Sequence, residues 1–281
     1  MTPRAALLAS ALALTLLRPS RTADACSCIA PPMIVLPTLD APAPLDTHVW
    51  LRGPSVLALD LWDEKGHVLG KTDREVELRT APLPDRPSVR VPTTTTEYGD
   101  HWMPTVELVP SAPLAPRSVY EVWLVDRSPF ARTILAGAFR TGAERDASPP
   151  VWGGLTGARV DDPMWPHATI TLAGDCGESL YVDLSGPPAS DEGPVLYGVW
   201  TSAATDALDY SAPPVAILRA GSTSTFLSIG RLGCWPVEVP LPKADSLRVG
   251  VVAIDLAGKR SAPSDLVLDL RSPPGQAKRR R

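Results

Sequence analysis

The sequence predicts an all-β protein, with two antiparallel β-sandwiches in tandem after a signal peptide. Proline makes up 32 of the 281 residues, more than twice its usual share of about 5%, and proline breaks helices but suits turns and strand edges. The apolar fraction of 44% is ordinary for a globular chain, so a core can form. Short alternating apolar runs recur with turn residues between them, which is typical of sandwiches.

The first half of the chain supplies the strands of a sandwich that we expect over residues 47–142. Apolar and polar residues alternate, or β-branched and aromatic residues cluster, in several short runs. Gly66 ends a turn between two of these runs, where it can adopt a positive φ. The strand candidates are 47–52, 56–62, 68–69, 75–79, 106–108, 119–125 and 135–140.

A sharper signal lies before the run 119–125. Leu114, Pro116 and Tyr120 have the spacing Leu-x-Pro-x-x-x-Tyr. This run resembles the entry to strand F of fibronectin type III and related Ig-like domains. The resemblance implies that the Tyr120 hydroxyl bonds back to the backbone and fixes the corner between the sheets, so that Leu114 and Tyr120 are structural residues. Residues 138–142 resemble the last strand of bacterial Ig-like domains of the surface-layer type.

The second half repeats the pattern after a Pro-rich linker at residues 143–150. We expect a second sandwich over 151–271. Its strand candidates are 169–172, 180–184, 195–201, 215–219, 225–229 and 237–241.

The end of this half carries its own resemblance. Leu241 and Leu247 repeat the spacing of Leu114 and Tyr120, with leucine at the tyrosine position. Residues 248–264 then resemble strand F, the turn and strand G of a fibronectin type III domain, where A-x-D-x-A-G-x-x-S recurs. The resemblance implies that Leu241 is structural, that Leu247 packs without a hydroxyl bond, and that Asp255 supports the turn.

The N-terminus predicts export. Residues 1–25 combine Arg4, an apolar run too short to span a bilayer, and the small-x-small sequence of residues 23–25. Cleavage there would leave Cys26 first, in a Cys- and Pro-rich segment at 26–46. A lipid anchor on Cys26 is disfavoured, because Asp24 is acidic and no leucine precedes the cysteine by three residues. We expect the periplasm, the outer envelope or the extracellular space.

Four cysteines occur in the chain: Cys26, Cys28, Cys176 and Cys234. An oxidising compartment makes disulfides the expectation, and four cysteines allow three pairings. We favour Cys176 with Cys234, since both lie in the second half. The pairing of Cys26 and Cys28 stays open.

Charge and motifs limit the function classes. A net charge of −4 predicts neither a nucleic-acid nor a membrane-surface partner, and the basic residues at 272–281 are expected to be a solvated tail. No run is long enough for a transmembrane helix. Hydrolase, zinc, P-loop and dinucleotide motifs are missing, so we predict a non-enzyme without cofactor or metal. Asp60, Asp63 and Glu64, and separately Asp161 and Asp162, supply too few oxygens for calcium.

A binding or structural spacer function remains, in a protein expected to be monomeric. The irregular segment 81–103, with His101 and Trp102, is the first candidate for a binding surface, and Trp165 is another. The partner would be an envelope protein or a polysaccharide. Two alternatives stay open: a carbohydrate-binding accessory protein, and a metalloprotease inhibitor acting through Cys26, since Cys26-Ser27-Cys28 resembles the start of tissue inhibitors of metalloproteinases.

Overall fold

The computed structural model describes residues 33–53, 58–62, 68–99, 104–127, 133–161, 180–220, 227–231, 239 and 244–269. Fifteen strands, β1 to β15, lie in these segments, and the described residues between the strands form no helix. Accordingly, the described part of the chain has no helix long and apolar enough to cross a membrane. The all-β prediction is confirmed.

The first sandwich has two four-stranded sheets. Its inner sheet, next to the second sandwich, has the order β1 (Ile34–Leu36), β2 (Val49–Arg52), β6 (Thr105–Pro110) and β5 (Thr93–Tyr98). Its outer sheet has the order β3 (Ala58–Trp62), β4 (Val68–Thr80), β7 (Val119–Asp126) and β8 (Thr133–Arg140). With β3 as an added edge, these sheets have the A-B-E-D and C-F-G orders of a constant-type Ig domain.

Side chains that point between these two sheets form the core of the first sandwich. Every second residue of β7 is buried, because strand side chains alternate between faces. The buried cluster combines residues of β2, β6, β4, β7 and β8, and its members include Leu51, Leu108, Leu78, Val122 and Phe139. The core is therefore shared by strands distant in sequence.

The segment 81–103 is not the long irregular loop that we expected. Its residues Thr93–Tyr98 form β5, which pairs along the whole of β6. Threonine favours strands because its branched Cβ fits a pleated surface. In addition, Val89 O accepts the Thr80 N–H at 2.9 Å and Leu78 O accepts the Val91 N–H at 2.8 Å, so residues 89–91 extend the outer sheet beside β4.

The second sandwich has one sheet of three strands and one of four. The three-stranded sheet has the order β13 (Leu227–Arg231), β10 (Leu180–Ser185) and β9 (Gly157–Asp161). The four-stranded sheet has the order β12 (Ala216–Arg219), β11 (Leu196–Ala203), β14 (Ser246–Ile254) and β15 (Ser264–Asp269). In the conventional lettering of Ig sandwiches, the two sheets have the orders E-B-A and C′-C-F-G. The strand that follows C in the chain, β12, therefore pairs with C, which is β11. The tandem sandwich prediction is confirmed.

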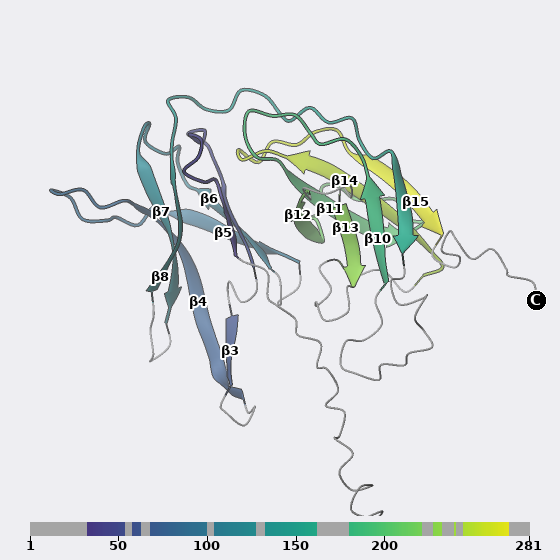
Figure 1. The fold of residues 1–281 in the computed structure, drawn as a ribbon, viewed down its shortest axis with the longest axis horizontal. Coiled ribbons are helices and arrows are strands. Elements are labelled where there is room, and N and C mark those ends of the chain that lie inside the picture. The colour runs from purple at the N-terminus through teal and green to yellow at the C-terminus, as the bar shows by residue number, and fades with distance from the viewer. Residues whose placement is uncertain are drawn as a thin grey trace, which may run out of the picture.

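The four sheets are stacked as layers. In Figure 1 the β3-β4-β7-β8 sheet lies at the left, strands β5 and β6 of the next sheet lie beside it, and the two sheets of the second sandwich overlap at the right. Separate apolar clusters fill the first and second sandwiches, and a third joins the two middle layers. The two sandwiches thus pack side by side through their sheet faces.

Candidate functional site

The first candidate region is the joint, the apolar cluster between the two sandwiches. Its residues point away from the core of their own sandwich and toward the other one. Each is 4% exposed or less. The buried members are Leu36, Trp50, Leu196, Trp200, Ile217, Val252, Ile254 and Leu256. Strands β11 and β14 are therefore covered on both faces.

Two glycines make space for the aromatic rings of the joint. A Cβ at Gly198 would come within 2.9 Å of the Trp200 ring, and a Cβ at Gly250 would overlap the Tyr210 hydroxyl. The Trp200 and Tyr210 rings meet edge to face with centroids 5.2 Å apart. Trp200 Nε1 also donates to the Ala212 carbonyl at 2.9 Å, so this ring is held in one orientation.

Several polar groups of the joint pair with one another, whereas Trp50 Nε1 and the Tyr210 hydroxyl have no hydrogen-bond partner among the described residues. Glu107 is 7% exposed and accepts two bonds, from His48 Nδ1 at 2.6 Å and from the Tyr98 hydroxyl at 2.6 Å. Burial, followed by the bond to Glu107, raises the pKa of Tyr98. Hydrogen bonds also cross between the sandwiches. Leu256 O accepts the His48 N–H at 2.5 Å and the Thr47 hydroxyl at 3.4 Å, and Thr105 Oγ1 donates to Ile217 O at 3.1 Å.

An acidic cluster lies beside Leu256. It contains Asp146 of the segment between the sandwiches, Asp191 of the β10–β11 connection and Asp255, which follows β14. One carboxylate oxygen of each lies within 4.8 Å of the others. Lys259 Nζ lies 3.4 Å from Asp146 Oδ1 and donates to Asp146 O at 2.7 Å. Three separate parts of the chain thus converge on one point.

Asp255 is the most buried member of this cluster, with no exposed surface. Its Oδ1 accepts the Lys259 N–H at 2.9 Å, whereas its Oδ2 has no hydrogen-bond partner among the described residues. Burial, together with the neighbouring Asp146 carboxylate, raises the pKa of Asp255 to about 7. Bonds from backbone N–H groups oppose this rise. Desolvation has the larger effect, because an ionised oxygen without a partner is costly to bury.

A groove connects this cluster to solvent. Its volume is about 460 Å³, and it runs between the Pro-rich stretch 37–44 and the β10–β11 connection. Asp146, Asp191, Glu192 and Leu256 contribute to its lining. The groove is wide enough for water and small ions.

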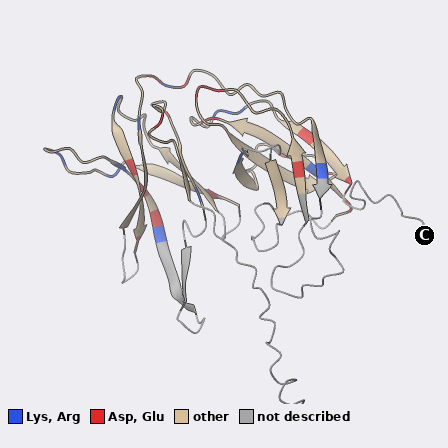
Figure 2. Ribbon diagram, viewed as in Figure 1, with Lys and Arg blue, Asp and Glu red and all other residues tan. Residues whose placement is uncertain are grey.

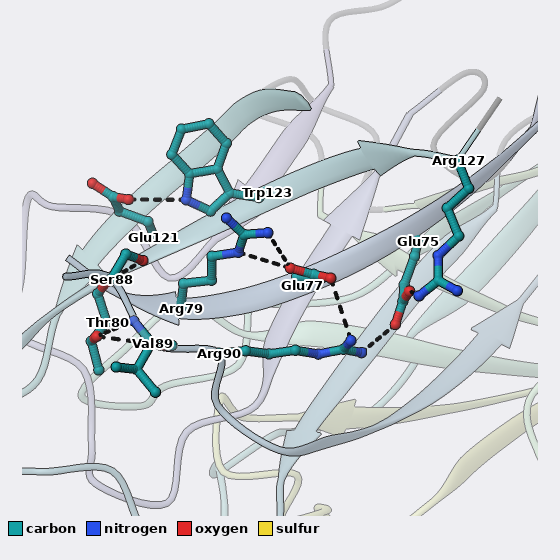
Figure 3. Close-up of polar contacts among 10 residues, drawn as sticks. All are labelled: Glu75, Glu77, Arg79, Thr80, Ser88, Val89, Arg90, Glu121, Trp123 and Arg127. Carbon is teal, nitrogen blue, oxygen red and sulfur yellow. Dashed lines mark hydrogen bonds and ion pairs between the residues drawn. The ribbon is translucent and has the colours of Figure 1, made fainter. Parts of the chain in front are cut away.

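The second candidate region is the open face of the outer sheet of the first sandwich. Acidic and basic residues follow one another closely along β4 (Figure 2). Figure 3 shows their side chains in a row beside Arg90 and beside Glu121 and Trp123 of β7. We call this row the ladder face; it consists of Glu75, Glu77, Arg79, Arg90, Glu121, Trp123 and Arg127.

Ion pairs hold the β4 half of the ladder face. Arg79 Nε donates to Glu77 Oε2 at 2.8 Å. Arg90 Nη1 lies 3.3 Å from Glu77 Oε1, and its other terminal nitrogen pairs with Glu75 (Figure 3). Arg127 also pairs with Glu75. Glu75 and Glu77 therefore each meet two guanidinium groups.

Trp123 anchors the β7 half of the ladder face. It lies opposite Glu77 in the sheet register, its Nε1 donates to Glu121 Oε2 at 2.9 Å, and the Arg79 guanidinium lies 5.8 Å from its ring centroid. It is half-buried on the outer face, because it alternates with the buried residues of β7. Leu135, opposite it on β8, is 49% exposed, so apolar surface adjoins the charged row.

The structure places Leu114 and Tyr120 at the corner of the first sandwich. Both are buried. The Tyr120 hydroxyl accepts the Ala115 N–H at 2.8 Å. In the second sandwich Leu247 is fully buried, and a different tyrosine makes a bond of this kind: the Tyr197 hydroxyl accepts the Ala189 N–H at 2.8 Å.

Several predicted residues lie outside the described residues. These are the signal peptide, Cys26, Cys28, Cys176, Cys234, His101, Trp102, Trp165, Leu241 and the C-terminal tail. The pairing of the cysteines and the aromatic binding surface thus stay predictions.

Sequence reasoning did not find the joint or the ladder face. A signal for the joint was present, because Val249–Ile254 is apolar without a break, as expected for a strand covered on both sides. A signal for the ladder face was also present. Every second residue of one strand is charged, at Glu75, Glu77 and Arg79, and Glu121 lies on the solvent side of a second strand. The acidic cluster has no such signal, since its members are far apart in the chain.

No protein-family model and no curated protein sequence matches the chain. Among solved structures, the chain aligns with the N-terminal Ig1-2 module of the Drosophila receptor protein tyrosine phosphatase DLAR, at 10% identity over 84% of this chain and 98% of that one, with a TM-score of 0.25. A marsupial T cell receptor aligns at 8% identity over 88% and 100%, with a TM-score of 0.23. At such scores the assignment to Ig-like sandwiches depends on the strand order of the two domains.

Proposed function

We propose that this chain is an exported, non-catalytic binding protein of the bacterial envelope or the extracellular space. Its two sandwiches, the first of which includes β1 (Ile34–Leu36), would act as one rigid body that presents the ladder face to a protein partner. The observation that carries this proposal is Trp123, held on an open sheet face between Arg79 and Glu121. Tryptophan and arginine are the side chains most enriched in binding hot spots.

The joint supports this choice of surface. It covers one outer face of each sandwich, and its described residues do not cover the ladder face or the outer face of the β13-β10-β9 sheet. The ladder face combines a half-buried tryptophan with the exposed apolar neighbour Leu135.

The electrostatics of the ladder face favour a protein over a polyanion or a polycation. Glu75, Glu77 and Glu121 offset the charges of Arg79, Arg90 and Arg127. The row is therefore close to neutral, and its side chains are already ordered by their mutual bonds. An ordered surface loses less side-chain entropy on binding.

Site-specific photo-crosslinking in the producing cell tests the proposal. A photoreactive residue at Leu135 is expected to capture one discrete protein, and the Trp123→Ala change should abolish that product. The matched control carries the same photoreactive residue at Val267, which is 54% exposed on the second sandwich and should not capture it. Equal capture at both positions, or capture that survives Trp123→Ala, would refute the ladder face as the binding surface.

A further inference from the structure

The acidic cluster beside the joint has an electrostatic deficit. Asp146, Asp191 and Asp255 carry three negative charges when ionised, and Lys259 supplies one positive charge. Among the described residues, Lys259 is the cation paired with the cluster, and it pairs with Asp146. The remaining deficit of two charges equals the charge of one divalent cation.

A buried oxygen without a partner points into the same place. Asp255 is fully buried, and its Oδ2 accepts no hydrogen bond from the described residues. Oδ1 is used by the Lys259 N–H. Buried carboxylates are normally satisfied by donors or by metals. Because the Asp255 carboxylate lies within 4.8 Å of those of Asp146 and Asp191, a shared cation would satisfy this oxygen.

The ligand set favours calcium. All the side-chain ligands are carboxylates, which hard cations prefer, and calcium takes six to eight oxygens at flexible geometry. Three carboxylates can supply three to six of them, according to whether each binds through one or both oxygens. Water from the adjoining groove can complete the shell, since Asp146 and Asp191 line that groove.

We propose that Asp146, Asp191 and Asp255 bind a single Ca²⁺, which ties the segment between the sandwiches to the second sandwich. Asp146 belongs to that segment, and its N–H donates to Asp46 Oδ1 of the first sandwich at 2.9 Å. The ion therefore links the first sandwich, the segment between the sandwiches and the second sandwich, which meet at the joint. This inference is independent of the ladder face.

Calorimetric titration of the chelator-treated full chain with calcium chloride tests the site. We expect one ion per chain, with a dissociation constant of about 0.1–1 mM. The melting temperature should be higher in about 1 mM calcium than in chelator, because an ion that binds the folded state stabilises it.

Asp191→Asn is the informative variant. The Asp191 carboxylate accepts the Gly193 N–H at 3.3 Å, and the asparagine amide oxygen can accept the same bond. Affinity for calcium should fall roughly tenfold or more as one charged ligand is lost. Asp209→Asn is the matched control, because Asp209 accepts the Ser211 N–H at 2.9 Å in a turn outside the cluster. The calcium affinity of this variant should equal that of the unsubstituted chain.

Two results would overturn the inference. If the unsubstituted chain binds no calcium, and its melting temperature is the same in calcium and in chelator, then Asp146 and Asp255 share a proton and no ion. If Asp191→Asn binds calcium as tightly as the control, the ion lies elsewhere. The melting temperature of each variant in chelator shows whether it is folded.

Discussion

Ile254→Ala removes a side chain that would be on the surface if the second sandwich stood alone. In the joint this side chain is 3% exposed and contacts the facing sheet cluster. The change removes about three carbon atoms, worth roughly 0.8 kcal/mol each as lost burial. Because the joint cannot close fully around the gap, the total is expected to be about 2–5 kcal/mol.

Ile229→Ala is the matched core variant. Ile229 is 1% exposed inside the second sandwich, so its loss of unfolding free energy should be of the same size, about 2–5 kcal/mol. Val267→Ala is the surface control, with an expected change within about 0.5 kcal/mol.

Urea unfolding of the full chain, followed by tryptophan fluorescence, measures all three variants. The midpoint for Ile254→Ala should fall as far as that for Ile229→Ala. If instead the midpoint for Ile254→Ala equals that of the surface control, then the two sheet faces do not pack against each other in solution and the joint does not form.

Three further perturbations test separate features of the fold. Tyr120→Phe leaves the Ala115 N–H without its acceptor and should cost about 1 kcal/mol of unfolding free energy, read as a lower urea midpoint; an unchanged midpoint would contradict a role for this bond. Gly258→Ala places a Cβ at φ +79° and against the His48 ring, so it should cost at least about 1–3 kcal/mol. Gly157→Ala, with nothing within 4 Å, should melt within a few degrees of the unsubstituted chain. The pKa of Asp255 is raised to about 7, so the folded state favours its protonated form. In chelator, its contribution to the free energy of unfolding is therefore complete below the ordinary aspartate pKa of about 4. This contribution is lost as the pH rises to about 7, by at most about 1.4 kcal/mol per pH unit. Urea midpoints across this range should fall more steeply for the unsubstituted chain than for Asp255→Asn, and parallel curves would contradict the assignment.

Local features of the sequence were enough for the fold of each half. The alternation in Val119–Asp126 predicts a strand with one buried face, and every second residue of β7 is in fact buried. The turn residues after Ile254 predict a hairpin, and β14 does pair with β15. The segment 93–98 was harder, because a run of threonines is compatible with both a polar loop and an edge strand until β6 lies beside it.

The candidate sites were much less accessible to sequence reasoning. The ladder face depends on the register between β4 and β7, which places Glu77 opposite Trp123. From the sequence without that register, the same residues have the pattern of ordinary solvent-exposed charges. The acidic cluster requires Asp146, Asp191 and Asp255 to meet from three distant segments, and no local pattern encodes that meeting.

The sequence by itself determined most of the strands and the class of two tandem sandwiches, because alternation and turn chemistry act between near neighbours in the chain. The strands β1, β5 and β9 and the pairing of the strands came from the tertiary structure. Tertiary structure alone decided which outer faces are covered. Trp50 and Trp200 each lie on an outer face, and only the docking of one sandwich on the other buries them. This burial depends on the complementary shapes of two complete sheets, and no single segment of the chain determines those shapes.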